Sequence, residues 1–374
     1  MQTRGMNILH LSAVSNWGGG ENHIENLCTE LASSNPEINN IIFCVKNGPF
    51  HERLKQTEIE HIAAPLGIKV DLRFSFKLGK VCKSKKIDLI HIHDTTAIQL
   101  AIIADKIYNL PPFIFSKKTS FEIKQRKKTL YKYNYPKIKK ILCVSEETKR
   151  VSEKAVVDHS KLITIYHGTN LKTKSDKTPF LLRDKLSIGK DKIIIGNVAN
   201  HIRAKHLDTW VNVANRIINY EKKTNFFFVQ IGTFTERTQP LLDRIKELDL
   251  SAHMVFLGYT PNGSNFIPQF DISLMTSQSE GVPQFIYESM CHKIPVVSTD
   301  VGGIPEIIEH ETNGLLAPMH DDKKLAELVL KLSDNTEMKK KFVNDAYNKL
   351  IANFTTSKMA QRTVEVYKEI LQNV

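Results

Sequence analysis

Two glutamates stand eight positions apart in the second half of the chain. Glu280 follows Ser279 and precedes a glycine and a proline, and Glu288 lies in an amphipathic run that predicts a helix. In one continuous helix they would be about 12 Å apart, at a rise of roughly 1.5 Å per residue. Carboxylates that hydrolyse a glycosidic bond stand about 5 to 9.5 Å apart. The spacing therefore favours contacts with two ends of one elongated ligand.

The residues after Glu288 extend this pattern. An apolar run, Ile294–Ser298, predicts a strand, and a second tight turn follows at Val301–Glu306. Alternating strand, glycine turn and helix brings loop backbone and helix N-termini to one edge of an α/β sheet, where ligands bind. With P-V-V-S-T-D-V-G-G-I-P-E-I-I (295–308) and N-G-L-L (313–316), the segment resembles the E-x7-E region of the retaining glycosyltransferases of family 4, which have the GT-B fold.

A glycine-rich loop, Gly18–Gly20, lies between a predicted strand and a predicted helix near the N-terminus. Its free N–H groups and the helix dipole suit a negatively charged ligand. No Lys-Ser/Thr pair follows, so it is not a P-loop, and its spacing is not that of G-x-G-x-x-G. It resembles the G-G-x-E loop of family 4. That resemblance implies that Gly19 and Gly20 face the donor diphosphate, and that Gly19, Glu21 and His23 face the acceptor; a flexible turn is the alternative.

A strand with two histidines is predicted at 88–93. With a period of two, His91 and His93 share one face of this strand and two isoleucines share the other. His93 would lie at the carboxyl end, where α/β proteins place their chemistry. The segment resembles the family's D-x-x-H-x-H pattern. That implies that His93 approaches the donor sugar near the reacting carbon, whereas His91 is a structural residue.

In family 4 enzymes, the loop after the strand that contains Gly196 supplies cations. A nucleoside diphosphate leaving group needs them, because they offset the negative charge that develops on it. The resemblance implies an Arg and a Lys five residues apart. Lys205 matches the Lys, but Asn200 stands where the Arg is expected. Arg203 is a substitute from within the loop, or the site relies on Lys205 and backbone amides.

The resemblance also implies roles for the two glutamates. Glu280, with the backbone of the residues that follow it, meets the sugar hydroxyls near the transferred carbon. Glu288 accepts hydrogen bonds from the ribose hydroxyls, for which a carboxylate is a strong acceptor. Gly232 belongs to a segment that resembles the I-G-x-G loop, without its second glycine. The donor-binding set is thus Gly19, Gly20, Asn200, Arg203, Lys205, Gly232, Glu280, Gly281, Val282, Pro283 and Glu288, and the catalytic set is His93, Lys205 and Glu280.

The composition, 374 residues with 41% apolar and 25% charged, is that of a globular protein of two ordinary domains. No apolar run approaches the 18 or so residues of a membrane span, and no signal peptide is predicted. Five scattered cysteines without a C-x-x-C pair indicate reduced, mostly buried thiols in a cytosolic protein. No H-E-x-x-H or clustered Cys/His pattern occurs, so we expect neither a metal nor a cofactor.

The net charge of +12 is concentrated in residues 117–140, whose ten Lys/Arg and one acid carry +9. Aromatic residues interleave with these charges. The charge alone leaves three interpretations: a solvated basic helix, a surface for anionic lipid, and a nucleic-acid patch. No nucleic-acid-binding motif occurs, so we expect no nucleic-acid partner. The segment lies in the half of the chain to which the resemblance assigns the acceptor. We therefore expect it to bind an anionic membrane surface that holds a lipid-linked acceptor.

Apolar β-branched runs alternate with helical patterns in both halves, which predicts parallel sheets with crossover helices. The first half has the strand candidates 6–12, 41–46, 88–93, 113–116, 141–145 and 162–166, and the helix candidates 21–33, 74–84, 96–108 and 146–154. The second half has the strand candidates 192–199, 226–231, 254–257, 272–275 and 295–298, and the helix candidates 206–220, 239–248, 284–291, 323–333, 337–352 and 356–372. A polar stretch at 172–179 is the best linker.

The fold class predicted is α/β: the resemblance implies GT-B, two Rossmann-like domains facing each other across a cleft. The predicted domains are 1–172, for the acceptor, with 355–374 crossing back to it, and 173–354, for the donor. The implied function is retaining, metal-independent transfer of a sugar from a nucleotide diphosphate sugar to a saccharide or lipid-linked acceptor. The expected place is the cytoplasm, at the inner face of the membrane. The alternatives are a degenerate GT-B module that binds sugar nucleotide without transfer, suggested by Asn200, and a nucleotide-sugar 2-epimerase.

Overall fold

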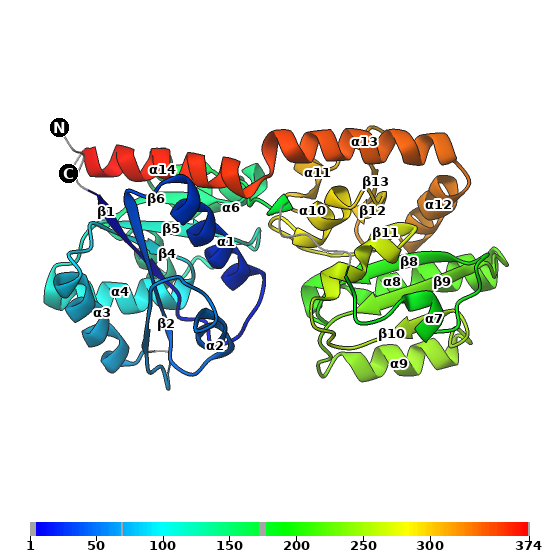
Figure 1. The fold of residues 1–374 in the computed structure, drawn as a ribbon, viewed down its shortest axis with the longest axis horizontal. Coiled ribbons are helices and arrows are strands. Elements are labelled where there is room, and N and C mark those ends of the chain that lie inside the picture. Colours follow the sequence, from blue (N-terminus) through cyan, green and yellow to red (C-terminus); the bar gives the residue numbers. More distant parts are fainter. Residues whose placement is uncertain (1–4, 69, 172–176, 373–374) are drawn as a thin grey trace. The chain divides into compact units, whose positions relative to one another are not determined.

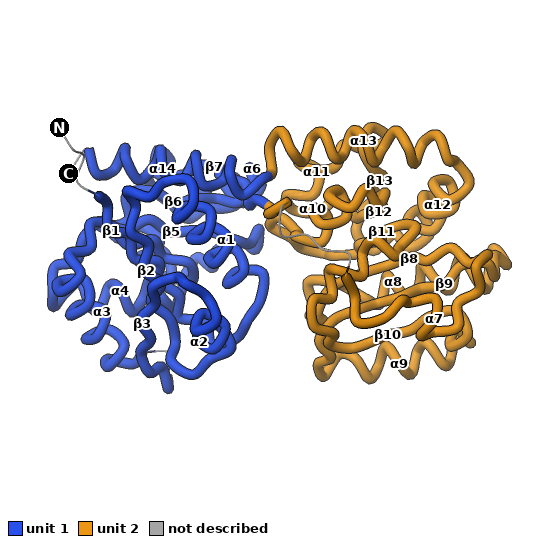
Figure 2. The backbone as a smooth tube through the Cα atoms, viewed as in Figure 1, with its two compact units in different colours: residues 1–168, 355–374 blue, residues 169–354 orange. Residues whose placement is uncertain are grey.

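The computed structural model describes residues 5–68, 70–171 and 177–372. The chain divides into two compact units, one of residues 1–168 and 355–374 and the other of residues 169–354 (Figure 2). The boundary after residue 168 lies four residues before the predicted one. Most of the predicted linker, residues 172–176, lies outside the described residues.

Unit 1 is built on a parallel seven-stranded sheet in the order β3-β2-β1-β4-β5-β6-β7. Its strands are β1 Met6–Leu11, β2 Ile38–Val45, β3 His61–Ala64, β4 Leu89–Ile92, β5 Phe113–Lys117, β6 Ile138–Cys143 and β7 Leu162–Thr164. Its helices are α1 Gly19–Ser34, α2 Pro49–Leu54, α3 Leu72–Ser84, α4 Thr95–Tyr108, α5 Lys127–Tyr133, α6 Glu146–Glu153, the 3₁₀ turn His159–Lys161, and α14 Thr356–Gln372. The order changes direction at β1, which pairs with β2 on one side and β4 on the other.

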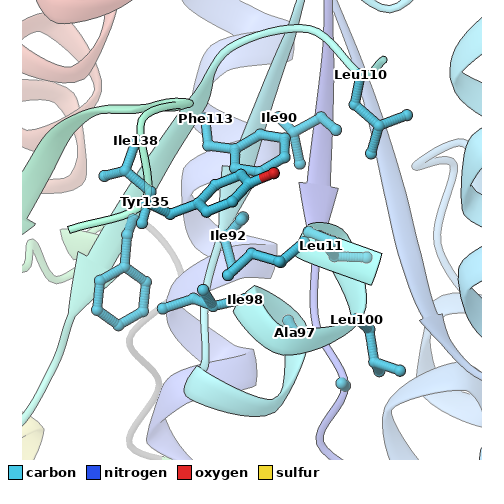
Figure 3. Packing of buried hydrophobic residues seen from close by; sticks show 14 of the residues in the cluster. Leu11, Ile90, Ile92, Ala97, Ile98, Leu100, Leu110, Phe113, Tyr135 and Ile138 are labelled. Atoms are coloured by element: carbon cyan, nitrogen blue, oxygen red, sulfur yellow. The ribbon is translucent and has the colours of Figure 1, made fainter. Parts of the chain in front are cut away.

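The two faces of this sheet are covered by different helices, as the strand period requires. Ile90 and Ile92 of β4 pack into a large apolar cluster with residues of α3 and α4. Figure 3 shows both isoleucines beside Ala97 and Ile98 of α4. Leu89 points to the other face, into a cluster with residues of α1 and α14. Helix α14, at the C-terminal end of the chain, thus packs on the same sheet as β1, the first strand of the chain (Figure 1).

Unit 2 repeats the plan with a parallel six-stranded sheet in the order β10-β9-β8-β11-β12-β13. Its strands are β8 Ile193–Val198, β9 Phe226–Ile231, β10 Met254–Phe256, β11 Ile272–Met275, β12 Val296–Thr299 and β13 Leu315–Ala317. Its α-helices are α7 Leu182–Lys185, α8 Leu207–Asn215, α9 Thr238–Glu247, α10 Gln284–Cys291, α11 Ile304–Ile307, α12 Asp322–Ser333 and α13 Thr336–Asn353. A π-helical turn, Arg216–Tyr220, continues α8, and 3₁₀ turns lie at Arg203–Lys205 and Gly263–Gln269.

The chain crosses between the units twice, and the two crossings run side by side. The Thr169 N–H donates to the Phe354 carbonyl at 2.9 Å. A Cβ on Gly168 would lie 2.3 Å from the Thr355 carbonyl carbon, so this close approach requires glycine. The break between α13 and α14, predicted near 353–354, falls at this place. Among the described residues, no helix combines the length and the apolar composition that crossing a membrane requires.

Candidate functional site

In unit 2, the loops after β8, β9 and β11 are joined by hydrogen bonds at the carboxyl edge of the sheet. The Gln278 N–H donates to the Ala204 carbonyl at 2.8 Å, which joins the loops after β11 and β8. The Thr235 hydroxyl donates to the His201 carbonyl at 2.6 Å, which joins those after β9 and β8. Such bonds fix the loops before any ligand arrives.

Lys205 and Glu280, which are 75 residues apart in the sequence, form an ion pair in these loops. The Lys205 Nζ lies 2.6 Å from Glu280 Oε1. Their side chains are 20% and 10% exposed, so water screens the pair only in part. A charge-assisted hydrogen bond of this length is among the stronger protein contacts. Two predicted catalytic residues are therefore brought together.

The two glutamates do not share a helix. Glu280 lies in the loop, whereas α10 begins at Gln284 and contains Glu288. The helix predicted at 284–291 is thus confirmed, and the separation of about 12 Å calculated for one continuous helix does not apply to this pair. Gly281, Val282 and Pro283 between them are buried. The Gly281 carbonyl accepts from the Gly303 N–H of the second predicted turn at 3.0 Å, so the two turns support each other.

Asn200 and Gly232 hold the loop after β8 against the loop after β9. The Asn200 Oδ1 accepts from the Thr233 N–H at 3.0 Å. A Cβ on Gly232 would lie 1.9 Å from the Ala199 carbonyl oxygen, so only glycine fits. Both residues thus have a structural task, whether or not they also contact a ligand.

Arg203, the predicted substitute for the missing arginine, lies in the wall of a cavity of about 600 Å³. His206, Asp208 and Arg237 line the same cavity, between the beginnings of α8 and α9. The Arg203 carbonyl accepts from the Gln278 side chain at 2.9 Å, so the backbone of this turn is fixed.

In unit 1, the glycine loop is partly helical. Gly18 is the N-cap of α1, and Gly19 and Gly20 belong to its first turn rather than to a loop. Burial raises the pKa of Glu21, against the charge of Lys118. The Lys118 ammonium donates to the Gly20 carbonyl at 2.9 Å. Burial lowers the pKa of Lys118 to about 8, although Glu21 and another carboxylate favour its charged form.

Three buried histidines lie close together near the carboxyl edge of the unit 1 sheet: His10 of β1, His91 of β4 and His93, which directly follows β4. Each has a ring nitrogen within 4.8 Å of the others, a spacing that a metal ion could use. His10 and His91, however, already have a hydrogen-bond partner at both ring nitrogens. His91 binds the hydroxyls of Tyr367 and Ser116 at 2.6 and 2.7 Å. The expected absence of a metal stays a prediction.

Two further histidines stand beside this cluster. His23, in α1, stacks on His167 with ring centroids 3.8 Å apart, and lies edge-on to His93 at 6.0 Å. Burial lowers the pKa of all five histidines, that of His10 to about 4 and that of His167 to about 3, so the rings are neutral at pH 7. Within the described part of the chain, three buried histidine nitrogens lack a hydrogen-bond partner: His23 Nδ1, His93 Nδ1 and His167 Nε2.

Comparison with known families decides what this arrangement is. The family model described as "Glycosyltransferase Family 4" matches residues 17–173, and that described as "Glycosyl transferases group 1" matches residues 180–349. Together they span most of both units. The chain belongs to the family 4 glycosyltransferases. The predicted recognition is confirmed.

Curated relatives and solved structures agree with this assignment. The N-acetyl-alpha-D-glucosaminyl L-malate synthase of Bacillus anthracis is 20% identical over 81% of this chain and 80% of its own length. The UDP-Gal:alpha-D-GlcNAc-diphosphoundecaprenol alpha-1,3-galactosyltransferase of Escherichia coli is 20% identical over 89% of each chain. The structure of Anabaena HepE with UDP-glucose has a TM-score of 0.84 at 18% identity, and covers 97% of this chain and 100% of its own. The GT-B fold class, with two Rossmann-like domains, is confirmed.

The basic segment of this glycosyltransferase is not one continuous charged surface. Lys117 is buried at the end of β5, where its ammonium donates to Thr119 and burial lowers its pKa to about 8. Lys140, on β6, pairs with Glu369 at 3.0 Å. Four cations at and before the start of α5 are exposed to solvent: Lys124, Arg126, Lys127 and Lys128.

The sequence interpretation missed three residues of the unit 1 site, namely His10, Lys118 and His167. Each belongs to a different segment, and none forms a local motif. One available signal was position, because each lies on or just after a strand of the parallel sheet, whose carboxyl ends meet at one edge. The interpretation also treated the five cysteines as mostly buried, and four of them are.

Proposed function

We propose that this family 4 glycosyltransferase catalyses retaining transfer of a sugar from a nucleotide diphosphate sugar to a hydroxyl of a saccharide or lipid-linked acceptor, in the synthesis of a cell-surface polysaccharide or glycolipid. The observation that carries the proposal is the ion pair between Lys205 Nζ and Glu280 Oε1, which are 2.6 Å apart in two loops joined by hydrogen bonds. Glu280 lies four residues before the start of α10, the helix that contains Glu288. This arrangement provides a cation for a diphosphate and carboxylates for hydroxyls within unit 2.

In the proposed reaction, the bond between the anomeric carbon and the β-phosphate oxygen breaks while the acceptor hydroxyl oxygen attacks the same face. The hydroxyl proton passes to the leaving phosphate oxygen. Lys205 would offset the charge that develops on the diphosphate. Glu280 and the backbone of 281–283 would bind the sugar hydroxyls, and Glu288 those of the ribose. Offsetting this charge with protein groups makes a metal ion unnecessary, which is also part of the proposal.

Uridine diphosphate sugars are the first donors to test. The solved relative HepE holds UDP-glucose, and the Escherichia coli relative uses UDP-Gal by its name. A thermal-shift panel of UDP-, GDP- and ADP-sugars tests the donor site. Ligand at 100 times its Kd adds about 2.7 kcal/mol of stability. We expect one nucleotide class to raise the melting temperature, and Glu288→Ala to abolish the shift. Glu337→Ala, whose side chain is 84% exposed in another helix of unit 2, should keep it. A shift unaffected by Glu288→Ala would refute the donor role of Glu288.

We propose further that the exposed cations near α5 bind an anionic membrane, where a lipid-linked acceptor resides. The lining of a groove of about 460 Å³ beside them includes the apolar Ile102 and Ile103 together with Lys127, Lys128 and Tyr131. Tyr131 is 50% exposed, as suits an aromatic ring at a lipid interface. The acceptor of the Escherichia coli relative is itself a diphosphoundecaprenol by its name.

Co-sedimentation with vesicles tests this membrane surface. Vesicles rich in phosphatidylglycerol should bind the protein at low salt, and neutral phosphatidylcholine vesicles should not. Neutralising Lys124, Arg126, Lys127 and Lys128 together should abolish binding, since each exposed cation near an anionic surface contributes about 1 kcal/mol. A matched control neutralises four exposed cations of unit 2, Lys190, Lys222, Lys223 and Lys246. Equal binding by the two variants would contradict the proposal.

A degenerate module that binds donor without transfer is the second candidate, and Asn200 favours it. Where the family carries an arginine, this chain has an amide that holds the Thr233 N–H. Such a module would bind a sugar nucleotide in the thermal-shift panel yet neither transfer the sugar nor hydrolyse the donor. Slow release of UDP from the bound UDP-sugar, lost with Lys205→Met, would decide for the enzyme.

A further inference from the structure

A chain of hydrogen bonds crosses three neighbouring strands of unit 1 and ends at His93. Asn40 lies on β2, His10 on β1, and His93 directly after β4, and these strands are adjacent in the order β2-β1-β4. The Asn40 Oδ1 lies 3.1 Å from His10 Nε2, and His10 Nδ1 lies 3.1 Å from His93 Nε2. Because the side chain of Asn40 is an amide, it determines which ring nitrogens of His10 and His93 carry a proton.

Asn40 can only accept at His10. Its Nδ2 donates to the Ile38 carbonyl at 3.1 Å, which fixes the amide with its oxygen toward the imidazole. An amide oxygen has no proton to give, so His10 Nε2 carries the hydrogen of that bond. Burial holds the His10 ring neutral at pH 7, so its Nδ1 has a lone pair and no proton.

The tautomer of His10 determines that of His93. The bare His10 Nδ1 can only accept, so the hydrogen between the two rings belongs to His93 Nε2. Burial and the neighbouring histidines hold the His93 ring neutral as well. Its Nδ1 therefore carries a lone pair. This nitrogen is buried and has no hydrogen-bond partner in the described part of the chain.

We propose that Asn40 and His10 are positioning residues that hold His93 in its Nε2–H tautomer, so that His93 Nδ1 accepts a hydrogen bond from a hydroxyl of the transferred sugar. A buried acceptor without a partner destabilises a protein by about 1–3 kcal/mol. A sugar hydroxyl removes this penalty, because it can donate. The opposite tautomer would set two bare acceptors against each other at His10 or at Asn40. The identity of the ligand, though not the tautomer, rests on the proposed function.

Nitrogen NMR of the ligand-free protein tests the tautomer directly. In protein labelled with ¹⁵N-histidine, two-bond proton–nitrogen correlations distinguish a protonated ring nitrogen from a bare one, and His93→Gln assigns the His93 signals. We expect His93 and His10 each to be protonated at Nε2 and bare at Nδ1. A protonated His93 Nδ1 would overturn the inference. So would one tightly bound metal ion per purified chain in elemental analysis, because the ion would occupy these nitrogens.

Variants of two neighbouring asparagines separate positioning from general stability. Asn40→Leu removes the acceptor that orients His10, and the His93 tautomer should become mixed or reverse. Asn39→Leu is the matched control, because Asn39 directly precedes Asn40 in β2 but is exposed and forms its hydrogen bond with Asn7. The control should leave the His93 signals unchanged. An unchanged His93 tautomer in a folded Asn40→Leu protein would contradict the positioning role.

The contact between His93 and the sugar is tested by adding a UDP-sugar in one experiment and free UDP in another. If the thermal-shift panel selects another nucleotide class, the sugar nucleotide and free nucleotide of that class are used instead. We expect the intact donor to move the His93 Nδ1 resonance and the free nucleotide to leave it in place. Asn40→Leu should weaken donor binding about fivefold, the effect of one neutral hydrogen bond, without changing the affinity for free nucleotide. A donor that binds without moving this resonance would overturn the sugar contact. Failure of the donor site itself appears separately, as absence of the Glu288-dependent thermal shift.

Discussion

The ion pair between Lys205 and Glu280 allows stability and donor binding to be separated in one experiment. Lys205→Met removes the charge but keeps most of the side-chain volume. Because Glu280 is only 10% exposed, its carboxylate is left with little water to replace the ammonium at 2.6 Å. Leaving one charged partner poorly compensated destabilises a protein by about 2 kcal/mol, below the 3–5 kcal/mol of a fully buried pair.

This penalty is large enough to measure. For a unit of this size, 1 kcal/mol shifts the melting temperature by about 2–4 °C. We therefore expect Lys205→Met to lower the melting transition of unit 2 by about 4–8 °C in scanning calorimetry. Because unit 1 has its own core, its transition should stay in place. Donor affinity should fall about 10- to 100-fold, since the charged contact with the diphosphate is worth about 1.5–3 kcal/mol.

The double variant Lys205→Met/Glu280→Leu decides whether the reasoning holds. An apolar pair of similar volume has no stranded charge, so the melting temperature should return close to that of the wild type. Donor binding should not return, because both groups that are proposed to bind the donor are gone. A double variant as unstable as the single one would show that the loops, rather than the charge, carry the loss. A Lys205→Met protein with full donor affinity would remove Lys205 from the proposed site.

Three further predictions concern single residues. Asn200→Arg should raise the affinity for UDP about 10-fold in calorimetry by restoring the family's cation, while lowering stability through loss of the bond to Thr233; unchanged affinity would show that the diphosphate does not pass this position. Tyr367→Phe should lower stability by about 1–3 kcal/mol in urea unfolding, because the buried ring of His91 loses its partner at 2.6 Å; a neutral effect would mean that this nitrogen finds another partner. Burial lowers the pKa of Lys117 to about 8, so the folded chain has released this proton between pH 8 and 10.5 while the unfolded chain keeps it, and this group makes stability rise with pH. Between pH 7.5 and 10, Lys117→Met should therefore gain less stability in urea unfolding, or lose more, than the wild type; identical pH profiles of the two proteins would refute the buried ammonium.

The long elements and the carboxyl-edge loops could be predicted because their signals are local. Strands β8, β9 and β11 are mostly apolar because they are buried in a parallel sheet, although Asn197, Gln230 and Ser273 interrupt the apolar runs. The loops with Lys205 and Glu280 follow two of these strands, and the resemblance to family 4 implied that both residues belong to one site. Their direct contact could not be predicted, because it depends on loop conformations that hydrogen bonds across 75 residues define.

The missed elements are short and take their stability from the tertiary structure. Strands β3 and β13 have four and three residues, and helices α7 and α11 have four each, too few for a periodic signal. The basic segment was misleading for a related reason. Charge counting treats Lys117 like Lys127, but the strand that contains Lys117 is buried and carries it inside.

The polar groups at the carboxyl edges of the two sheets differ in charge, and the difference follows from burial. Unit 2 presents a fixed charge pair at the ends of β8 and β11, where part of each side chain still reaches water. Unit 1 presents His23, His93 and His167, whose burial keeps them neutral, and each has a ring nitrogen without a hydrogen-bond partner among the described residues. Neutral acceptors and donors suit sugar hydroxyls, whereas an ammonium group suits a diphosphate. Under the proposed function, the Lys205 ammonium of unit 2 would therefore serve the diphosphate, and the neutral rings of unit 1 would serve hydroxyls.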